Sequence, residues 1–265
     1  MRANLQTNEF LNLLLWSGDL LARPTFRNLT DSYECWAYRR GLLQRLSRLE
    51  QQQIIERGDP TPDARMYRLT TQGRLQALGG RDPEQRWARV WDGQWRLVLW
   101  DVPMDRNAQR EKLRRRLRNR GFGWLQNSVW ITPDPLTEEA ELLRDAKPNV
   151  ESLLLLEARP CAGETDAEIV AGAWDFARIN RRYEQYAKVL EQRPLGNLHD
   201  ETTAKAFQRW AAAEREAWIN AVTHDPLLPA RLLPTGYLGQ DIWRRRHAAL
   251  GEAGQQIRSF TAAQV

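Results

Sequence analysis

The order of strands and helices predicted between residues 94 and 157 constrains the fold of this chain most. Short runs rich in Trp, Leu and Val predict strands. A helix is predicted between Pro103 and Gly121, and a second one is predicted at 137–146, where acidic residues occupy the first turn. The predicted elements are strands at 94–102, 123–126, 129–132 and 152–157 and helices at 107–120 and 137–146. This β-α-β-β-α-β order is that of a ferredoxin-like unit, which we predict as a central domain at residues 86–160.

Residues 1–80 show a different pattern, dense in Leu at helical spacing. The predicted elements are helices at 4–16 and 31–52, a short segment at 24–30 between them, and two strands at 53–56 and 65–69 around a turn rich in Gly and Pro. Helices followed by a hairpin in this order are typical of a winged helix-turn-helix, so we predict a winged-helix DNA-binding domain at 1–80. Residues 79–84, with two Gly and a Pro, form the predicted linker.

Helical patterns fill the rest of the chain, predicted as an all-α C-terminal domain at residues 165–265. The predicted helices are 165–190, 199–222 and 242–250. The proline-rich loop 225–239 before the last helix is stiff, and Leu228 and Leu232 within it must be buried against some surface. We expect these leucines to pack on the first two helices. The predicted fold class is α+β, with three domains.

The chain has 265 residues and a formal net charge of +5, and its basic excess lies in the first half. Residues 86–135 alone carry 11 Lys or Arg against 5 Asp or Glu. A polyanion such as nucleic acid is therefore easier to place on the first half of the chain. The longest apolar run, Leu153–Leu156, is too short to cross a membrane. With two cysteines and no secretory signal pattern, the chain is expected to be cytoplasmic, with no membrane partner.

Arginines in the third predicted helix and in the hairpin are the candidate DNA contacts. A guanidinium group pairs with the edge of guanine in a major groove or with backbone phosphates. The candidate DNA-binding residues are Arg39, Arg40, Arg45, Ser47, Arg48, Arg57, Arg65 and Arg68. The alternative is that these side chains form a solvated helix surface with no role in binding.

Three stretches of the chain together carry a resemblance to a known family. They are Trp91–Pro103 (WDGQWRLVLWDVP), Leu113–Leu136 (LRRRLRNRGFGWLQNSVWITPDPL) and His224–Gly239 (HDPLLPARLLPTGYLG). In these stretches the chain resembles the PaaX family of bacterial transcriptional repressors. The resemblance implies a winged helix, a central domain similar to the small CRISPR-adaptation subunit, and a helical C-terminal domain. It also implies a dimer that releases operator DNA when an aryl-CoA thioester binds. The implied partners are double-stranded operator DNA, an acyl-CoA effector and a second copy of the chain, with no cofactor.

Two positions in the N-terminal domain depart from the pattern that the resemblance leads us to expect. Leu43 stands where an Arg is expected, and Gln53 stands where a small residue or Gly normally follows the helix. These departures favour either a changed DNA sequence preference or weakened binding. An interaction protein without DNA binding is therefore a further hypothesis.

The segment 107–120 carries seven basic residues and has only Leu113 and Leu117 as clear core anchors. A charge run of this kind is usually a solvated surface, and the alternatives are contact with the phosphates of DNA or of a CoA ligand. We name Arg114, Arg115 and Arg118 as candidate effector-binding residues, together with Trp124 and Trp243, which could line a ligand cleft.

A metal-dependent nuclease is the alternative from the enzyme class. Asp101 ends the first strand of the central domain, where nuclease relatives keep a metal-binding Asp. Phosphodiester chemistry needs several carboxylates around Mg²⁺, and the three His show no zinc-site spacing. We therefore expect no catalytic residue, no metal and no enzyme activity.

Overall fold

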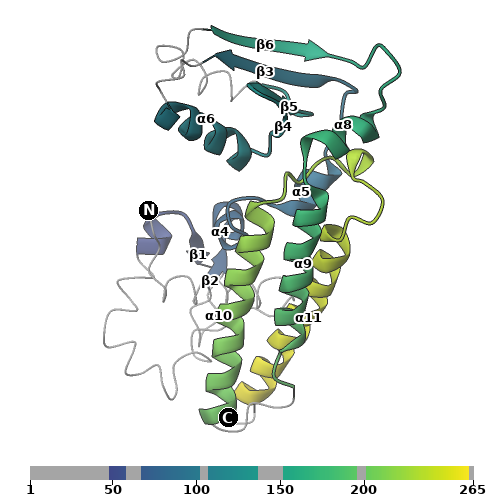
Figure 1. Ribbon diagram of the computed structural model, residues 1–265. Coiled ribbons are helices and arrows are strands. Elements are labelled where there is room, and N and C mark those ends of the chain that lie inside the picture. The colour runs from purple at the N-terminus through teal and green to yellow at the C-terminus, as the bar shows by residue number, and fades with distance from the viewer. Residues whose placement is uncertain (1–47, 58–66, 102–106, 137–151, 196–200, 263–265) are drawn as a thin grey trace. The chain divides into compact units, whose positions relative to one another are not determined.

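The computed structural model describes residues 48–57, 67–101, 107–136, 152–195 and 201–262 (Figure 1). The chain divides into two compact units, each formed by segments that are distant in the sequence. The first unit contains Met1–Arg81, Gln185–Ile219 and Gly239–Val265, and the second contains Asp82–Glu184 and Asn220–Leu238. Each unit is described by itself below.

A small hairpin and a short helix form the described N-terminal part of the first unit. Strand β1 (Ile55–Arg57) pairs antiparallel with β2 (Tyr67–Leu69), and Ile55 lies opposite Leu69. Helix α4 (Thr71–Ala77), which the sequence analysis did not predict, begins after Thr70, whose hydroxyl accepts a hydrogen bond from the Gly73 amide at 3.0 Å. The winged helix-turn-helix stays a prediction, because residues 1–47 lie outside the described part.

Three long helices form the rest of the first unit. They are α9 (Phe176–Glu191), α10 (Glu201–Thr223) and α11 (Gly239–Ala262), and they lie side by side (Figure 1). Two of them, α9 and α10, continue into the second unit. Aromatic rings pack between the three helices: the ring of Trp218 lies 5.4 Å from that of Tyr186, edge to face, and 5.2 Å from that of Trp243, at a tilt. Among the described residues, no helix has both the length and the apolarity needed to cross a membrane.

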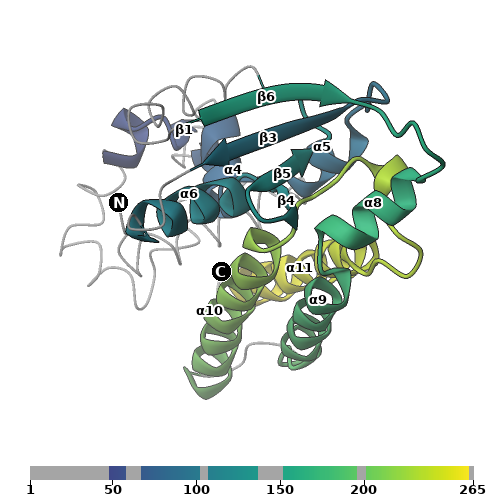
Figure 2. The same ribbon diagram turned by 45° about the horizontal axis from the view of Figure 1, so that its top comes forward.

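The second unit is built on a four-stranded antiparallel sheet in the order β4-β5-β3-β6. The strands are β3 (Trp95–Asp101), β4 (Gly123–Gln126), β5 (Val129–Thr132) and β6 (Ser152–Ala158). All four begin and end within one residue of the predicted strands. Helix α6 (Asn107–Asn119) covers one face of the sheet (Figure 2). It buries Leu113 and Leu117 in a cluster with Val98, Trp100 and Trp130. The second helix predicted for this unit, at 137–146, lies outside the described residues.

The opposite face of the sheet is covered by the segment that follows β6 and by a second segment from far along the chain. Helix α8 (Asp166–Ala173) and the 3₁₀ turn η4 (Ala230–Leu232) pack there, and a second core cluster joins them to the sheet. This cluster contains Trp91, Trp95, Ile131, Val170, Ala173, Trp174, Leu228 and Leu232. The prediction that Leu228 and Leu232 pack on the helix predicted at 165–190 is thus right. Their other neighbours come from the sheet domain, whose large apolar side chains are buried by this contact.

Two further element predictions were wrong in their bounds. The single helix predicted at 165–190 is two helices, since Trp174 has an extended backbone (φ −131°, ψ 135°) and buries its indole ring in the sheet cluster. The predicted linker contains the start of helix α5 (Pro83–Ala88), for which the Asp82 carboxylate accepts hydrogen bonds from the amides of Glu84 and Gln85. Asp followed by Pro is a common start of a helix, because Pro suits the first helical position. The prediction took Pro83 as a sign of a linker and therefore missed the helix.

Candidate nucleic-acid interface

The structure describes three of the eight residues predicted to contact DNA. Arg48 is exposed in a helical segment that continues to residue 51. Arg57 lies on β1 and Arg68 on β2, opposite Glu56. The other predicted residues, Arg39, Arg40, Arg45, Ser47 and Arg65, lie outside the described part. The DNA-binding assignment therefore stays a prediction for the whole set.

Gln53 occupies a backbone position that suits glycine. Its φ of 56° is in the left-handed region, where a side chain is disfavoured by about 1–2 kcal/mol. Its amide donates to the Glu50 carbonyl at 2.9 Å, and its own carbonyl accepts from the Thr70 hydroxyl. The expectation of a small residue or Gly here thus has a physical reason, namely the turn that leads from the helix into β1.

Helix α6 has the strongest concentration of positive charge among the described elements. Six of its 13 residues are Lys or Arg, and Glu111 is its one acidic residue. The exposed basic side chains are Lys112, Arg115, Arg116, Arg118 and, just after the helix, Arg120. The buried leucines fix the rotation of the helix on the sheet, so these cations face solvent. The run of charge seen in the sequence is therefore a charged surface.

Two of the predicted effector-binding arginines on α6 have partners within the second unit. Arg114 forms an ion pair with Glu111, with Nη1 and Oε1 2.7 Å apart. The guanidinium carbon of Arg118 lies 5.7 Å from the centre of the Trp130 ring, a cation–π contact. Arg115 is exposed.

The two tryptophans predicted to line a ligand cleft differ in their surroundings. Trp124 on β4 is 48% exposed, and its indole N–H donates to the Asn127 carbonyl at 3.0 Å. Trp243 on α11 is buried in the first unit between the rings of Trp218 and His247. Binding of an effector by either ring stays a prediction.

Asp101, the basis of the nuclease alternative, is exposed at the end of β3. No three His, Cys, Asp or Glu side chains of the described residues come together in a way that could hold a metal ion. Within that part of the chain, Asp101 therefore has no ligand set with which to bind Mg²⁺.

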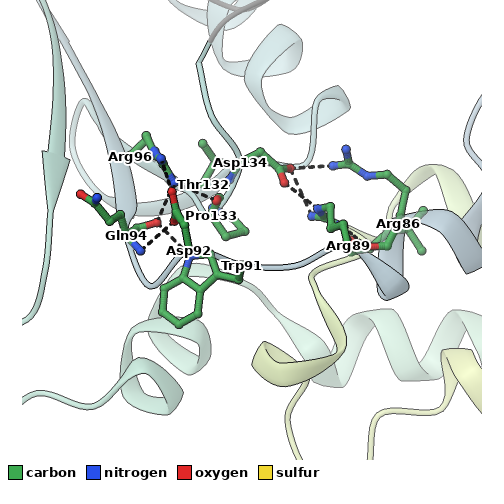
Figure 3. A network of polar contacts seen from close by, with 10 residues as sticks. Arg86, Arg89, Trp91, Asp92, Gln94, Arg96, Thr132, Pro133 and Asp134 are labelled. Atoms are coloured by element: carbon green, nitrogen blue, oxygen red, sulfur yellow. Dashed lines mark hydrogen bonds and ion pairs between the residues drawn. The ribbon is translucent and has the colours of Figure 1, made fainter.

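A network of arginines and carboxylates fixes the segment that leads from α5 into β3 (Figure 3). Asp134 accepts from Arg86 at 2.7 Å and from Arg89 at 2.6 Å, while Arg96 binds Asp92 through both Nη atoms at 2.8 and 2.5 Å. Burial lowers the pKa of Arg89, against the opposing effect of its hydrogen bond to Asp134. The hydrogen bond from Arg96 lowers the pKa of Asp92. Arg86 and Arg89 thus connect α5 and the residue after it to Asp134, which follows β5. Sequence reasoning did not single out these arginines.

A buried carboxylate in the proline-rich loop was also missed. Asp225 is 1% exposed and accepts hydrogen bonds from the hydroxyls of Tyr183 and Tyr237 and from the Leu227 amide at 2.7 Å. Burial, followed by the negative charge of Asp225, raises the pKa of both tyrosines well above the usual value. The sequence signal was the Asp-Pro pair, which indicates a turn without showing that the carboxylate is buried.

The central and C-terminal parts of the chain each match the model of a known domain family. Residues 88–170 match the PaaX protein central Cas2-like domain, and residues 174–259 match the PaaX-like protein C-terminal domain. Together the two matches cover more than half of the chain. The chain belongs to the PaaX family. Proteins of the PaaX family are generally regulators rather than enzymes.

One solved structure extends the similarity of this PaaX-family chain over nearly its whole length. It is the uncharacterized protein Rv0674 from Mycobacterium tuberculosis, with a TM-score of 0.52 and 20% sequence identity. The similarity covers 96% of this chain and 97% of that one. At this identity the likeness supports a shared fold. A search of curated proteins found no match.

Proposed function

We propose that this PaaX-family protein is a dimeric, DNA-binding transcriptional repressor that an acyl-CoA, specifically an aryl-CoA, releases from its operator. The observation that carries the proposal is the match of both the central and the C-terminal domain to the PaaX family, in the order the family has them. The basic excess in the first half of the chain and the charged surface of α6 support a polyanionic partner.

The mechanism we propose is a shift between two conformations of the dimer. Two winged helices bind two half-sites only when their separation matches that of the operator. An effector that binds better to a conformation with a different separation lowers the population able to bind DNA. The coupling cannot exceed the difference in effector affinity between the two conformations.

Binding to the DNA upstream of the protein's own gene tests the repressor function. Fluorescence anisotropy with this DNA and with a scrambled duplex should show tighter binding to the natural sequence and a steep dependence on salt, because several arginines displace counterions from phosphates. Arg45→Ala or Arg48→Ala should weaken operator binding by about 1–3 kcal/mol if the residue reads a base. Equal, salt-insensitive binding to both duplexes would contradict DNA-specific repression.

Release by the effector is tested in the same assay. Aryl-CoA thioesters should dissociate the preformed complex, and free CoA and the corresponding aryl carboxylates serve as controls. Sedimentation of the protein without DNA tests the dimer. Incubation of the protein with labelled DNA and RNA in Mg²⁺ or Mn²⁺ tests the nuclease alternative, for which we expect no cleavage.

A further inference from the structure

The outer face of α6 is formed by Lys112, Arg115 and Arg116, which are exposed while Leu113 and Leu117 are buried. Arg115 and Arg116 lie three and four residues after Lys112, so both are its neighbours on the helix surface. All three are exposed, and no acidic side chain of the described residues lies within ion-pair distance of any of them. Within the described part of the chain, the outer face is thus a group of positive charges without an acidic partner.

This arrangement is unfavourable for the stability of the folded protein. Like charges three or four residues apart repel, as Lys112 and Arg116 do here, and each such pair destabilises a helix by a few tenths of a kcal/mol. A surface selected only for solubility mixes charges of both signs, and α6 has one acidic residue among six basic ones. A chain that keeps such a surface gains something from it other than stability.

We propose that the outer face of α6 binds the phosphate backbone of double-stranded DNA as a second contact, in addition to the N-terminal domain. The proposal rests on the proposed DNA-binding function and names a further surface for it. The α-helical rise of about 1.5 Å per residue spreads the cations from Lys112 to Arg116 over about 6 Å. Along that length one DNA strand presents about two phosphates, roughly one for each 3.4 Å of helix axis.

The shape of the surface favours an extended polyanion over a CoA molecule. Sites for small ligands are concave and mostly apolar, with a few polar groups that fix orientation. The outer face of α6 is the solvent side of a helix and carries no aromatic ring that could stack on adenine. A contact to phosphates alone positions a protein on DNA and carries no sequence information.

A matched pair of double variants tests the proposal in the full-length protein. Lys112→Gln with Arg115→Gln removes two charges from the outer face of α6. Arg178→Gln with Arg181→Gln removes two exposed charges from α9 in the same unit and serves as the control. Binding of each protein to the natural upstream DNA and to a scrambled duplex is measured at several salt concentrations.

The α6 variant should bind both duplexes more weakly, with the ratio of the two affinities unchanged. The slope of log K against log salt should become shallower by about 2, roughly one unit for each lost phosphate contact. The control variant should keep the wild-type slope. Thermal unfolding checks the fold, and removal of the repulsion should leave the α6 variant at least as stable as the wild type.

Four results would overturn the proposal. An unchanged slope in a folded α6 variant, with the wild type binding DNA, would show that the outer face is a solvated surface while the repressor function stands. An equal loss of slope in the control would show a general charge effect. If the α6 variant bound DNA as the wild type does but bound CoA more weakly, the outer face of α6 would be a contact for the effector. If the wild type itself bound no DNA, the proposed function would fail as well.

Discussion

Gln53 carries a local strain that a single substitution should relieve. Its left-handed backbone (φ 56°) costs a residue with a side chain about 1–2 kcal/mol, and glycine adopts it freely. Glycine also has more conformational freedom to lose on folding, which offsets part of the gain. We expect Gln53→Gly to raise the free energy of unfolding by about 0.5–1 kcal/mol, measured by urea denaturation. Gln53→Ala is the control and should give no increase, so equal stabilisation by both would contradict the argument.

Asp225 should be one of the most sensitive residues in the second unit. Asp225→Ala leaves the buried Tyr183 hydroxyl, the partly buried Tyr237 hydroxyl and the Leu227 amide without their acceptor, and each unsatisfied donor costs about 1–3 kcal/mol. We expect a loss of about 3–5 kcal/mol in the free energy of unfolding. Tyr237→Phe removes one donor and leaves the carboxylate bound to two others, so it should cost about 1 kcal/mol. Similar losses in the two variants would show that the carboxylate is not the centre of this network.

Buried tyrosines should make the protein sensitive to alkaline pH. Burial, and after it the charge of Asp225 or Glu214, raises the pKa of Tyr183, Tyr186 and Tyr237 well above the usual value. Because the unfolded chain loses these protons from about pH 10 and the folded protein does not, stability is full below pH 10 and falls as the pH rises above it. Tyrosinate absorbance should show that three of the six tyrosines ionise only as the protein unfolds. Titration of all six in the folded state would contradict this.

At the scale of elements, the contact between β4 and α8 depends on the absence of a side chain at Gly123. A Cβ atom there would lie 2.6 Å from the Trp174 ring and 2.7 Å from the Ala173 side chain, both in the covered face of the sheet. We expect Gly123→Ala to destabilise the protein by about 1–3 kcal/mol in urea denaturation. The matched control is Gly172→Ala in α8, where a Cβ meets nothing within 4 Å and should stabilise the helix by about 0.5–1 kcal/mol. A neutral Gly123→Ala would show that the two elements separate easily.

The sequence predicted elements well where one local signal dominates and poorly where tertiary contacts decide. Runs rich in Trp, Leu and Val and the stops at Pro103 and Gly121 placed the sheet strands and α6 close to their observed bounds. The break at Trp174 was missed because an apolar residue fits the helical pattern on either side, and only packing on Gly121 and the sheet selects an extended backbone there. For the candidate interface, the sequence indicated the charge of α6. It could not show which cations face solvent, which depends on how Leu113 and Leu117 seat the helix.

At the scale of the whole molecule, the order of domains along the chain differs from the grouping of residues in space. The chain passes between the two compact units four times, and two of the four boundaries fall within α9 and α10. Patterns in a sequence indicate where an element begins and ends, but they carry no information about which distant segment covers an apolar face. The predicted boundaries at 86–160 and 165–265 therefore need a test on the protein itself.

The fragment 86–160 should fold poorly on its own, although it contains every described strand of the sheet. In the full chain, Trp91, Trp95 and Ile131 are buried under Val170, Ala173, Trp174, Leu228 and Leu232, all of which the fragment lacks. Burying one large apolar side chain contributes about 1.5–3 kcal/mol, so the loss of this cover exceeds what a small domain can spare. We expect the fragment to bind the hydrophobic dye ANS and to unfold without a sharp transition, with the full chain as control. Cooperative unfolding of the fragment at the midpoint of the full chain, without dye binding, would show instead that the central domain is stable by itself.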